Sequence, residues 1–246
     1  MAAEKKVLLV TGGGRGIGAA TALLAAERGY SVCVNYLRDE KSAVSLAKRI
    51  NGIAVQADVS FEAEVTRLFD EVDRKLGKIG ALVNNAGMVD RGIRVEAMAA
   101  ARITRMFAVN VTSAFLCSRE AIKRMSTRHG GNGGAIVNLS SIAAKLGAPG
   151  EYVDYAAAKG AVDTFTIGLA KEVGGEGIRV NGVRPGIIRT EIHESSGDPA
   201  RVDRIGAAAP MGRAGDPEEV ARAILWLLSD EASYLSGALV DVAGGR

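Results

Sequence analysis

The chain has 246 residues, of which 48% are hydrophobic and 24% charged, and its 31 basic and 28 acidic side chains leave a formal charge of +3. This balance is ordinary for a globular protein, and a chain of this length can bury a sizeable core without disulfides or a structural metal. With no dense run of Lys and Arg and only 4% aromatic residues, nothing indicates a nucleic-acid-binding protein.

Short β-branched runs alternate with longer helical patterns along the whole chain. Several of the strand runs are continuously apolar, which is typical of strands covered on both faces. The repeated βα units predict a doubly wound α/β Rossmann fold with a seven-stranded parallel sheet and helices on both faces. The expected strands are Val7–Val10, Ser31–Asn35, Ile53–Gln56, Ala81–Asn84, Ala135–Leu139, Arg179–Val183 and Ala238–Val242, and helices are expected near Gly16–Arg28, Lys41–Ile50, Glu62–Leu76, Glu96–Arg128, Tyr152–Val173 and Glu218–Ser229.

No internal repeat, low-complexity tract or linker divides the chain, so one domain over residues 1–246 is expected. The last helix has a readable start, with Asp216 as the N-cap, Pro217 in the first position and Glu219 in the third. The segment Arg189–Gly215 precedes it and lacks a strong period. Such an insertion at the carboxyl edge of a parallel sheet predicts a substrate loop or lid, with an exposed connection as the alternative.

The cysteines and histidines form no pattern typical of a disulfide or a metal site. Cys33 and Cys117 both lie in apolar surroundings and are predicted to be buried, whereas His129 and His193 are expected at the surface. The N-terminus leads into the first strand without a long apolar signal region, and the longest apolar stretches fall short of a membrane span. A cytoplasmic location is therefore expected.

A glycine-rich turn follows the first strand, where Thr11-Gly12-Gly13-Gly14-Arg15-Gly16-Ile17-Gly18 leads into the first helix. Glycine allows a sharp turn, close approach of a pyrophosphate and tight packing of the helix on the sheet. Unpaired N–H groups at the helix start would face the phosphate. We therefore predict dinucleotide binding, with a purely structural turn as the alternative. The expected contacts are Gly12, Gly14, Arg15, Gly16, Ile17 and Gly18.

The end of the second strand indicates which dinucleotide is bound. An acidic residue there would hold the ribose hydroxyls of NAD, but this chain reads Asn35-Tyr36-Leu37-Arg38. No carboxylate in that stretch repels a 2′-phosphate, and Arg15 and Arg38 are candidate cations, so NADP(H) is favoured over NAD(H). Either arginine could instead be an ordinary solvated charge. Asn35, Tyr36 and Arg38 are included among the expected cofactor contacts.

Tyr155 and Lys159 are four residues apart and share one face of a predicted helix. A phenol titrates near pH 10, and a neighbouring cation lowers that value, as an oxidised nicotinamide would also do. The pair alone is a common surface arrangement. However, the strand before this helix ends in Ser140-Ser141, and a hydroxyl at the carboxyl end of a parallel strand can donate a hydrogen bond to a substrate oxygen in the crevice.

With these motifs the chain closely resembles the short-chain dehydrogenase/reductase family over essentially its whole length. The family's nearest classes by resemblance are sugar or polyol dehydrogenases and 3-oxoacyl carrier-protein reductases. The expected pocket loops are Ala144–Asp154 and Arg189–Gly215, and a modest polar substrate is favoured by their polar and charged residues Glu151, Asp154, Glu191, His193 and Glu194. The motifs occur in the family's order and approximate spacing. They are Thr11–Gly18, Asp58-Val59, Asn84-Asn85-Ala86-Gly87, Asn110, Ser140-Ser141, Tyr155–Lys159 and Pro185-Gly186.

The resemblance implies a role for each of these residues. Tyr155 would be the general acid/base, while Lys159 would hold the nicotinamide ribose and depress the pKa of the tyrosine. Ser141 would orient the substrate oxygen, and Asn110 would help to hold a water-mediated proton relay. Further cofactor contacts are expected from Asp58 and Val59 near the adenine and from Asn85, Ala86, Gly87, Pro185, Gly186, Ile188 and Thr190 beside the cofactor.

Some alternatives stay open at this point. Ser141 lies one residue further from Tyr155 than is usual in the family, so Ser140 is kept as a supporting hydroxyl or a substitute. The motif Asn85-Ala86-Gly87 could be a strand-ending turn, Asn110 a satisfied mid-helix amide and Asp58 a plain helix cap.

The predicted activity is hydride transfer between NADP(H) and a secondary alcohol or carbonyl in a small molecule, and no metal, membrane or nucleic acid is implied. A rival hypothesis is an NADP(H)-binding regulatory protein without turnover, but such a protein has no chemical need for Ser141, Tyr155 and Lys159 together. Members of the family are usually tetramers or dimers. A homotetramer, or else a dimer, is expected through Glu96–Arg128 and Tyr152–Val173, with Ser236–Arg246 in a second interface.

Overall fold

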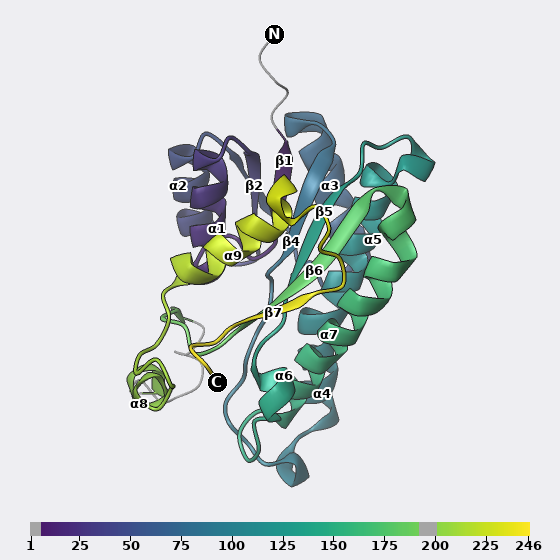
Figure 1. The fold of residues 1–246 in the computed structure, drawn as a ribbon. Helices are drawn as coiled ribbons and strands as arrows, with labels where there is room; N and C mark the ends of the chain where they lie inside the picture. The colour runs from purple at the N-terminus through teal and green to yellow at the C-terminus, as the bar shows by residue number, and fades with distance from the viewer. Residues whose placement is uncertain (1–5, 192–200) are drawn as a thin grey trace.

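The computed structural model describes residues 6–191 and 201–246, and a sheet of seven strands forms its centre (Figure 1). All neighbouring strands pair in parallel, in the spatial order β3-β2-β1-β4-β5-β6-β7. This confirms the predicted parallel sheet. The strands are β1 (Val7–Val10), β2 (Ser31–Tyr36), β3 (Ile53–Gln56), β4 (Ile79–Asn84), β5 (Gly134–Leu139), β6 (Ile178–Pro185) and β7 (Leu239–Val242).

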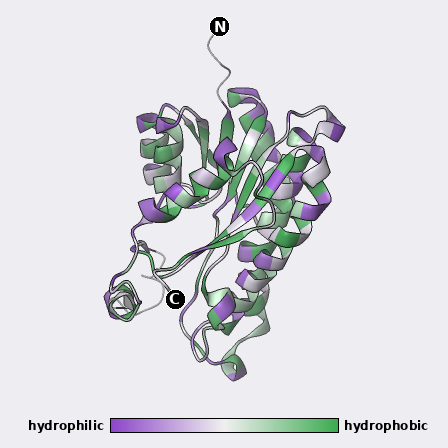
Figure 2. Ribbon diagram, viewed as in Figure 1, coloured by the Kyte–Doolittle hydropathy of each residue, from purple (hydrophilic) through white to green (hydrophobic). Residues whose placement is uncertain are grey.

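Helices cover both faces of the sheet, so the doubly wound α/β architecture is also confirmed (Figure 1). Figure 2 shows the strands as mostly hydrophobic and the hydrophilic residues concentrated on the helices. One layer consists of α1 (Gly16–Glu27), α2 (Glu40–Arg49) and α9 (Pro217–Leu228), and the other of α3 (Glu62–Leu76), α5 (Ser113–Met125) and α7 (Val153–Val173).

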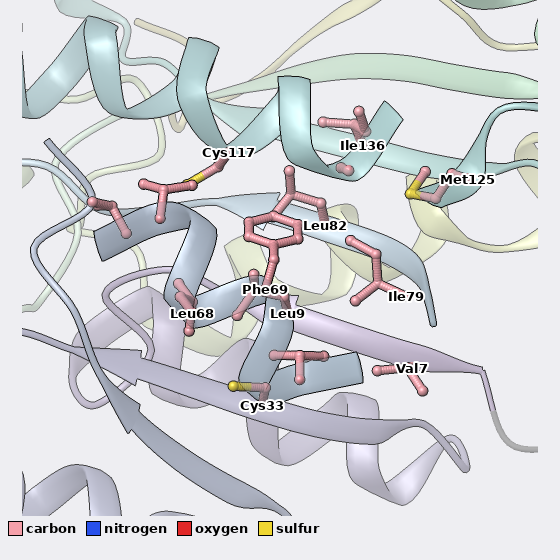
Figure 3. Packing of buried hydrophobic residues seen from close by; sticks show 14 of the residues in the cluster. Val7, Leu9, Cys33, Leu68, Phe69, Ile79, Leu82, Cys117, Met125 and Ile136 are labelled. Atoms are coloured by element: carbon pink, nitrogen blue, oxygen red, sulfur yellow. The ribbon is translucent and has the colours of Figure 1, made fainter. Parts of the chain in front are cut away.

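The core has two layers because successive strand residues point to opposite faces of the sheet. On β1, Leu8 packs in the layer of α1, α2 and α9, whereas Leu9 packs in the layer of α3, α5 and α7. Phe69 of α3 is completely buried in that second layer, close to Leu9 (Figure 3). Cys33 and Cys117 are buried there too, as the sequence predicted, and His129 is exposed. His193 lies outside the described residues.

The chain reverses its direction across the sheet between β1 and β4, since it runs outward through β2 and β3 and then returns to the other side of β1. The carboxyl ends of β1 and β4 therefore open the crevice where sheets of this type bind ligands. Thr11 joins the two loops at this point. Its Oγ1 donates to Val83 O (3.3 Å) and accepts from the N–H groups of Asn85 and Ala86 (3.0 Å each).

The helix expected over Glu96–Arg128 is interrupted. A 3₁₀ turn precedes α4 (Ala100–Phe107), and a π-helical turn at Ala108–Thr112 separates α4 from α5. Within that turn the Asn110 side chain donates to the carbonyl of Met106 and also bonds to the loop after β4, which disturbs the helical ladder. Because this contact is tertiary, the spacing of hydrophobic residues could not predict the interruption of the helix.

Two short helices were not expected from the sequence, α6 (Ala143–Leu146) and α8 (Arg201–Ala207), and neither is long enough to show a clear period. The second lies inside the segment Arg189–Gly215. A β-bridge between Ile188 and Gly215 closes the base of that segment, and Arg189 N donates to Gly215 O (2.9 Å). The segment thus leaves the sheet and returns at one point.

The start of α9 agrees with its sequence signals. Asp216 is the N-cap, Pro217 opens the helix and Glu219 accepts a hydrogen bond from Asp216 N (2.9 Å). Within residues 6–191 and 201–246, the helices are all too short or too polar to cross a membrane.

Candidate active site

The glycine-rich turn after β1 has the backbone that only glycine adopts easily. Gly12 has φ +59° and Gly16 has φ +51°, both in the left-handed region. A Cβ on Gly18 would lie 2.6 Å from Gly12 O, and one on Gly12 would lie 3.1 Å from Ala86 Cα. The turn is therefore packed directly against the loop after β4, with its backbone at the surface of the crevice.

The start of α1 is suited to an anion. Its N-cap, Arg15, makes no side-chain cap hydrogen bond, and the first turn contains no acidic residue. The first N–H groups of a helix have no intrahelical partners and carry the positive end of the dipole. Together with the glycine backbone, this start fits the pyrophosphate of a dinucleotide.

Asn35, at the end of β2, supports the turn from below. Its side chain is buried, its Oδ1 accepts from Gly12 N (3.2 Å), and its Nδ2 donates to Val55 O (3.3 Å) and Ala57 O (3.1 Å). The structure thus uses this amide within the protein, so Asn35 acts on the expected cofactor site by holding Gly12. The expectation of a direct contact from the Asn35 side chain gains no support from these bonds.

Arg15 and Arg38 are both exposed near the end of β2. Asp39 was not among the predicted site residues, and its Oδ2 lies 3.9 Å from Arg15 Nε. Asp39 is the N-cap of α2 and accepts from Ser42 N (3.0 Å), which lowers the pKa of the carboxyl. The pattern Asp39-x-x-Ser42 before a helix was the signal that identifies this cap. Arg15 therefore has the carboxylate of Asp39 beside it.

Asp58 and Val59 follow β3. Asp58 Oδ1 accepts from Ser60 N (3.0 Å) and Ser60 Oγ (2.6 Å), so the carboxylate organises the turn before α3, whose N-cap is Phe61. Val59 is buried in the core layer of α3. The Val59 side chain thus packs inward, whereas Asp58 stays at the crevice edge of the sheet.

The loop after β4 is bonded to the glycine turn on one side and to Asn110 on the other. Asn85 Nδ2 donates to Thr11 O and Gly12 O (2.9 Å each). A Cβ on Gly87 would lie 2.9 Å from Asn110 Oδ1 and 3.6 Å from Lys159 Nζ. This loop therefore brings the glycine turn and the Lys159 side chain to one crevice.

Asn110 is a buried amide at the interruption between α4 and α5. Its Oδ1 accepts from Met88 N (3.2 Å), and its Nδ2 donates to Met88 O and Met106 O (3.0 Å each). The side chain therefore ties the loop after β4 to the π turn. It is a satisfied amide, as one alternative held, but it lies at the helix break and lines the cavity described below.

Ser140 and Ser141 have different partners. Ser140 is buried and its Oγ donates to Lys159 O (3.1 Å), which fixes the strand end to α7. Ser141 Oγ accepts from Ala143 N (3.1 Å) and is hydrogen-bonded to Tyr155, a bond that lowers the pKa of the phenol. Of the two hydroxyls, Ser141 is the one that meets Tyr155.

Lys159 and Tyr155 lie side by side on α7, with Lys159 Nζ 5.6 Å from the centroid of the Tyr155 ring. The ammonium donates to Leu139 O (2.7 Å), and burial lowers the pKa of Lys159 to about 8, opposed by Asp163. Burial raises the pKa of Tyr155 above its usual value. The expected depression of that pKa by Lys159 stays a prediction, since burial and the hydrogen bond to Ser141 are the causes that act on the phenol here.

A cavity of about 470 Å³ is lined by all four predicted catalytic residues and by half of the predicted site residues as a whole. The end of β6 supplies one wall, and a Cβ on Gly186 would lie 2.7 Å from Ala243 Cα. The cavity is lined by Ile17, Asn85, Gly87, Asn110, Ser140, Ser141, Tyr155, Lys159, Pro185, Gly186, Ile188 and Thr190. The other predicted site residues do not line this cavity and lie at or after the carboxyl ends of β1 to β4. They are Gly12, Gly14, Arg15, Gly16, Gly18, Asn35, Tyr36, Arg38, Asp58, Val59 and Ala86.

Further lining residues were not singled out from the sequence, because no motif marks apolar or loop positions that only the fold brings together. Glu151, expected in a pocket loop, does line the cavity, whereas Asp154 forms an ion pair with Arg102 instead. His193 and Glu194 lie outside the described residues. The additional lining residues include Val89, Ile142, Leu146, Tyr152, Arg204 and Arg246.

A doubly wound sheet with a glycine turn at its switch point, and with a serine, a tyrosine and a lysine in one adjoining cavity, defines the class of Rossmann-fold oxidoreductases. The family model described as enoyl-(acyl carrier protein) reductase matches residues 12–246. The chain belongs to the short-chain dehydrogenase/reductase family.

Similar proteins cover nearly all of the chain. The uncharacterized oxidoreductase YgfF of Escherichia coli (strain K12) is 54% identical over 98% of this chain and 99% of its own length. A glucose and ribitol dehydrogenase homolog of Oryza sativa subsp. japonica is 39% identical over 98% of this chain and 86% of its own. A crystal structure described as ribose-5-phosphate isomerase from Brucella melitensis 16M has the same fold, with a TM-score of 0.90 and 31% identity over 98% of this chain and 92% of that one.

Proposed function

We propose that this protein is an NADP(H)-dependent oxidoreductase that transfers a hydride between the nicotinamide and a secondary alcohol or carbonyl. The observation that carries the proposal is the cavity shared by Ser141, Tyr155 and Lys159, which opens beside the glycine turn. Membership of an oxidoreductase family supports the same conclusion.

A bound nicotinamide supplies the hydride donor or acceptor, and the protein binds, orients and moves the proton. Tyr155 is the general acid/base, acting at the substrate oxygen through its phenol. Because burial raises the pKa of Tyr155, the phenol is protonated at neutral pH, which suits proton donation during reduction. Ser141, already hydrogen-bonded to Tyr155, orients the same oxygen.

Lys159 and Asn110 complete the proposed set. Lys159 directs its ammonium along the cavity wall between Leu139 O and the Tyr155 ring, where it can hold ribose hydroxyls. Asn110 fixes the loop after β4 through both atoms of its amide and lines the cavity, where it would help to hold a water-mediated proton relay.

The preference for NADP(H) rests on the end of β2, where Arg15 and Arg38 are exposed beside the predicted adenosine site. Asp39 Oδ2 lies 3.9 Å from Arg15 Nε, so Arg15 would have to leave Asp39 in order to bind a 2′-phosphate. A cytoplasmic location, suited to the two free cysteines, and a homotetramer are part of the same proposal. The similarity to a glucose and ribitol dehydrogenase homolog supports a polar sugar or polyol as the substrate class.

The test is a coupled assay with NADPH and NADH across aldoses, ketoses, polyols, simple ketones, ethyl acetoacetate and oxoacyl thioesters. We expect turnover with NADPH favoured, and a loss of at least about a hundredfold in kcat for Tyr155→Phe, since the phenyl ring cannot transfer the proton. Tyr234→Phe is the matched control, because the Tyr234 side chain is fully exposed.

Two results would contradict the proposal. Tyr155→Phe with more than a tenth of the parent activity would remove the acid/base role. Protein that binds NADPH but oxidises it with no compound in the panel would favour a regulatory binding protein.

A further inference from the structure

A nearly buried ion pair between Arg102 and Asp154 adjoins the outer wall of the cavity, meaning the wall formed by Val89, Glu151 and Tyr152. Arg102 of α4 donates from Nε to Asp154 Oδ2 (2.8 Å) and from Nη2 to Asp154 Oδ1 (3.4 Å). The two side chains are only 13% and 2% exposed. Asp154 immediately precedes Tyr155 in the first turn of α7, so the pair fixes the backbone at the proposed acid/base.

The same arginine also holds the loop that follows β4. Arg102 Nη1 donates to Arg91 O (2.6 Å), and two residues later Ile93 N donates to Glu151 O (2.9 Å). The two loops touch closely here, since a Cβ on Gly92 would lie 3.7 Å from Glu151 Cα. Arg102 of α4 therefore bonds to the loop at residues 88–94 and to the first turn of α7, and the loop at residues 88–94 in turn bonds to the loop that leads into α7.

Both of these loops supply walls of the cavity, through Val89 from the first and through Glu151 and Tyr152 from the second. The N-cap of α7, Tyr152, makes no side-chain cap hydrogen bond, so the ion pair of Asp154 is a side-chain contact that fixes the first turn of the helix. Hydrogen bonding to Asp154 raises the pKa of Arg102, so the guanidinium stays charged. Loss of either partner would leave the other charge buried and unpaired, which is strongly unfavourable.

We propose that Arg102 and Asp154 are positioning residues of this enzyme, which hold Tyr155 in its reactive place and close the outer wall of the substrate cavity. This inference rests on the proposed function, because it assigns the pair a purpose through Tyr155. An arginine bound to a carboxylate through two nitrogens is a directional contact, which suits such a role better than a lysine would.

The first test needs no substrate. Amide hydrogen exchange is measured for the parent, Asp154→Asn, Arg102→Met and Arg102→Lys, the last of which keeps the charge but not the two-nitrogen contact. We expect exchange to rise at least about tenfold in both residues 88–94 and 151–157 and to stay unchanged in the glycine turn after β1. The Kd for NADPH should change less than about twofold, since the pair does not contact that turn.

Arg94→Met is the matched control, because the Arg94–Glu96 pair lies in the same segment but is 73% and 71% exposed. That variant should leave exchange as in the parent. Faster exchange in only one of the two loops, or a uniform increase throughout the protein, would overturn the proposed coupling.

The second test asks whether the pair acts through Tyr155. Reduction of ethyl acetoacetate by NADPH is compared in the parent, Asp154→Asn, Tyr155→Phe and the double variant. We expect Asp154→Asn to lower kcat by about 10- to 100-fold in the parent background, as small misplacements of a catalytic group do. In the Tyr155→Phe background the further loss should be less than about twofold.

The outcomes separate the two proposals. Equal losses in both backgrounds mean that the pair acts only on overall stability and overturn the positioning role. An inactive Tyr155→Phe together with a normal Asp154→Asn overturns the positioning role alone, whereas an active Tyr155→Phe overturns the proposed function itself.

Discussion

Lys159 illustrates the cost of placing a charge in the proposed active site. Its side chain is almost fully buried, and burial lowers its pKa from the usual 10.5 to about 8, although Asp163 one turn further along α7 acts in the opposite direction. Below pH 8 the group is charged in both the folded and the unfolded chain. Between pH 8 and 10.5 only the unfolded chain holds the proton, so stability rises with pH in that window.

A neutral side chain at this position removes that dependence. We expect the free energy of unfolding of Lys159→Met, relative to the parent, to fall by about 3 kcal/mol between pH 7 and pH 10.5, at about 1.4 kcal/mol per pKa unit. Urea unfolding at several pH values measures this difference. Lys171→Met, at an exposed position of the same helix, should show no such trend. A constant difference for Lys159→Met would mean that the buried ammonium keeps its ordinary pKa.

At the scale of single elements, α9 shows how completely a local signal can define a helix start. Asp216, Pro217 and Glu219 occupy the positions predicted from their residue types, and Glu219 also pairs with Arg213 (2.7 Å). The pKa of Glu219 is lowered to about 2, mainly by Arg213 and then by the N–H of Asp216. The carboxylate thus stays ionised and capping at any pH at which the protein would be assayed.

The cap makes a measurable contribution to stability. We expect Asp216→Ala to lower the free energy of unfolding by about 1 kcal/mol, because first-turn N–H groups lose their acceptor. Urea unfolding at pH 7 tests this, with Glu231→Ala at an exposed position beyond α9 as the control. An unchanged midpoint for Asp216→Ala would show that the Arg213–Glu219 pair holds the helix start without it.

Other elements could not be read from local pattern. The interruption between α4 and α5 depends on Asn110 meeting Met88, a residue 22 positions away, so the sequence predicted one long helix. The pair Arg102–Asp154 spans 52 positions and has no spacing that marks it in a sequence. In contrast, the strands were predicted well, because burial on both faces makes them continuously apolar.

At the scale of the whole molecule, the topology of the sheet explains why residues far apart in the sequence could be predicted to lie at one candidate site. In a doubly wound sheet the carboxyl ends of all parallel strands meet at one edge, so motifs at strand ends must converge there. Gly87, Ser141 and Gly186 follow β4, β5 and β6, and all three line one cavity. The finer electrostatics did not follow from topology, since Asp39 beside Arg15 and Leu139 O at Lys159 depend on where side chains point.

The expected homotetramer or dimer would form through the outer side of α5 and α7, which exposes apolar side chains. Phe115 of α5 is 49% exposed and stacks on Phe165 of α7 with ring centroids 3.8 Å apart, and Ile167 of α7 is 39% exposed. In a two-fold dimer the same apolar patch of each subunit packs against the patch of the other. We therefore expect sedimentation velocity at micromolar concentration to give an oligomer for the parent and a smaller species for Phe115→Glu. Phe61→Ser, at an exposed phenylalanine before α3, should sediment as the parent does, and a monomeric parent would refute the expectation.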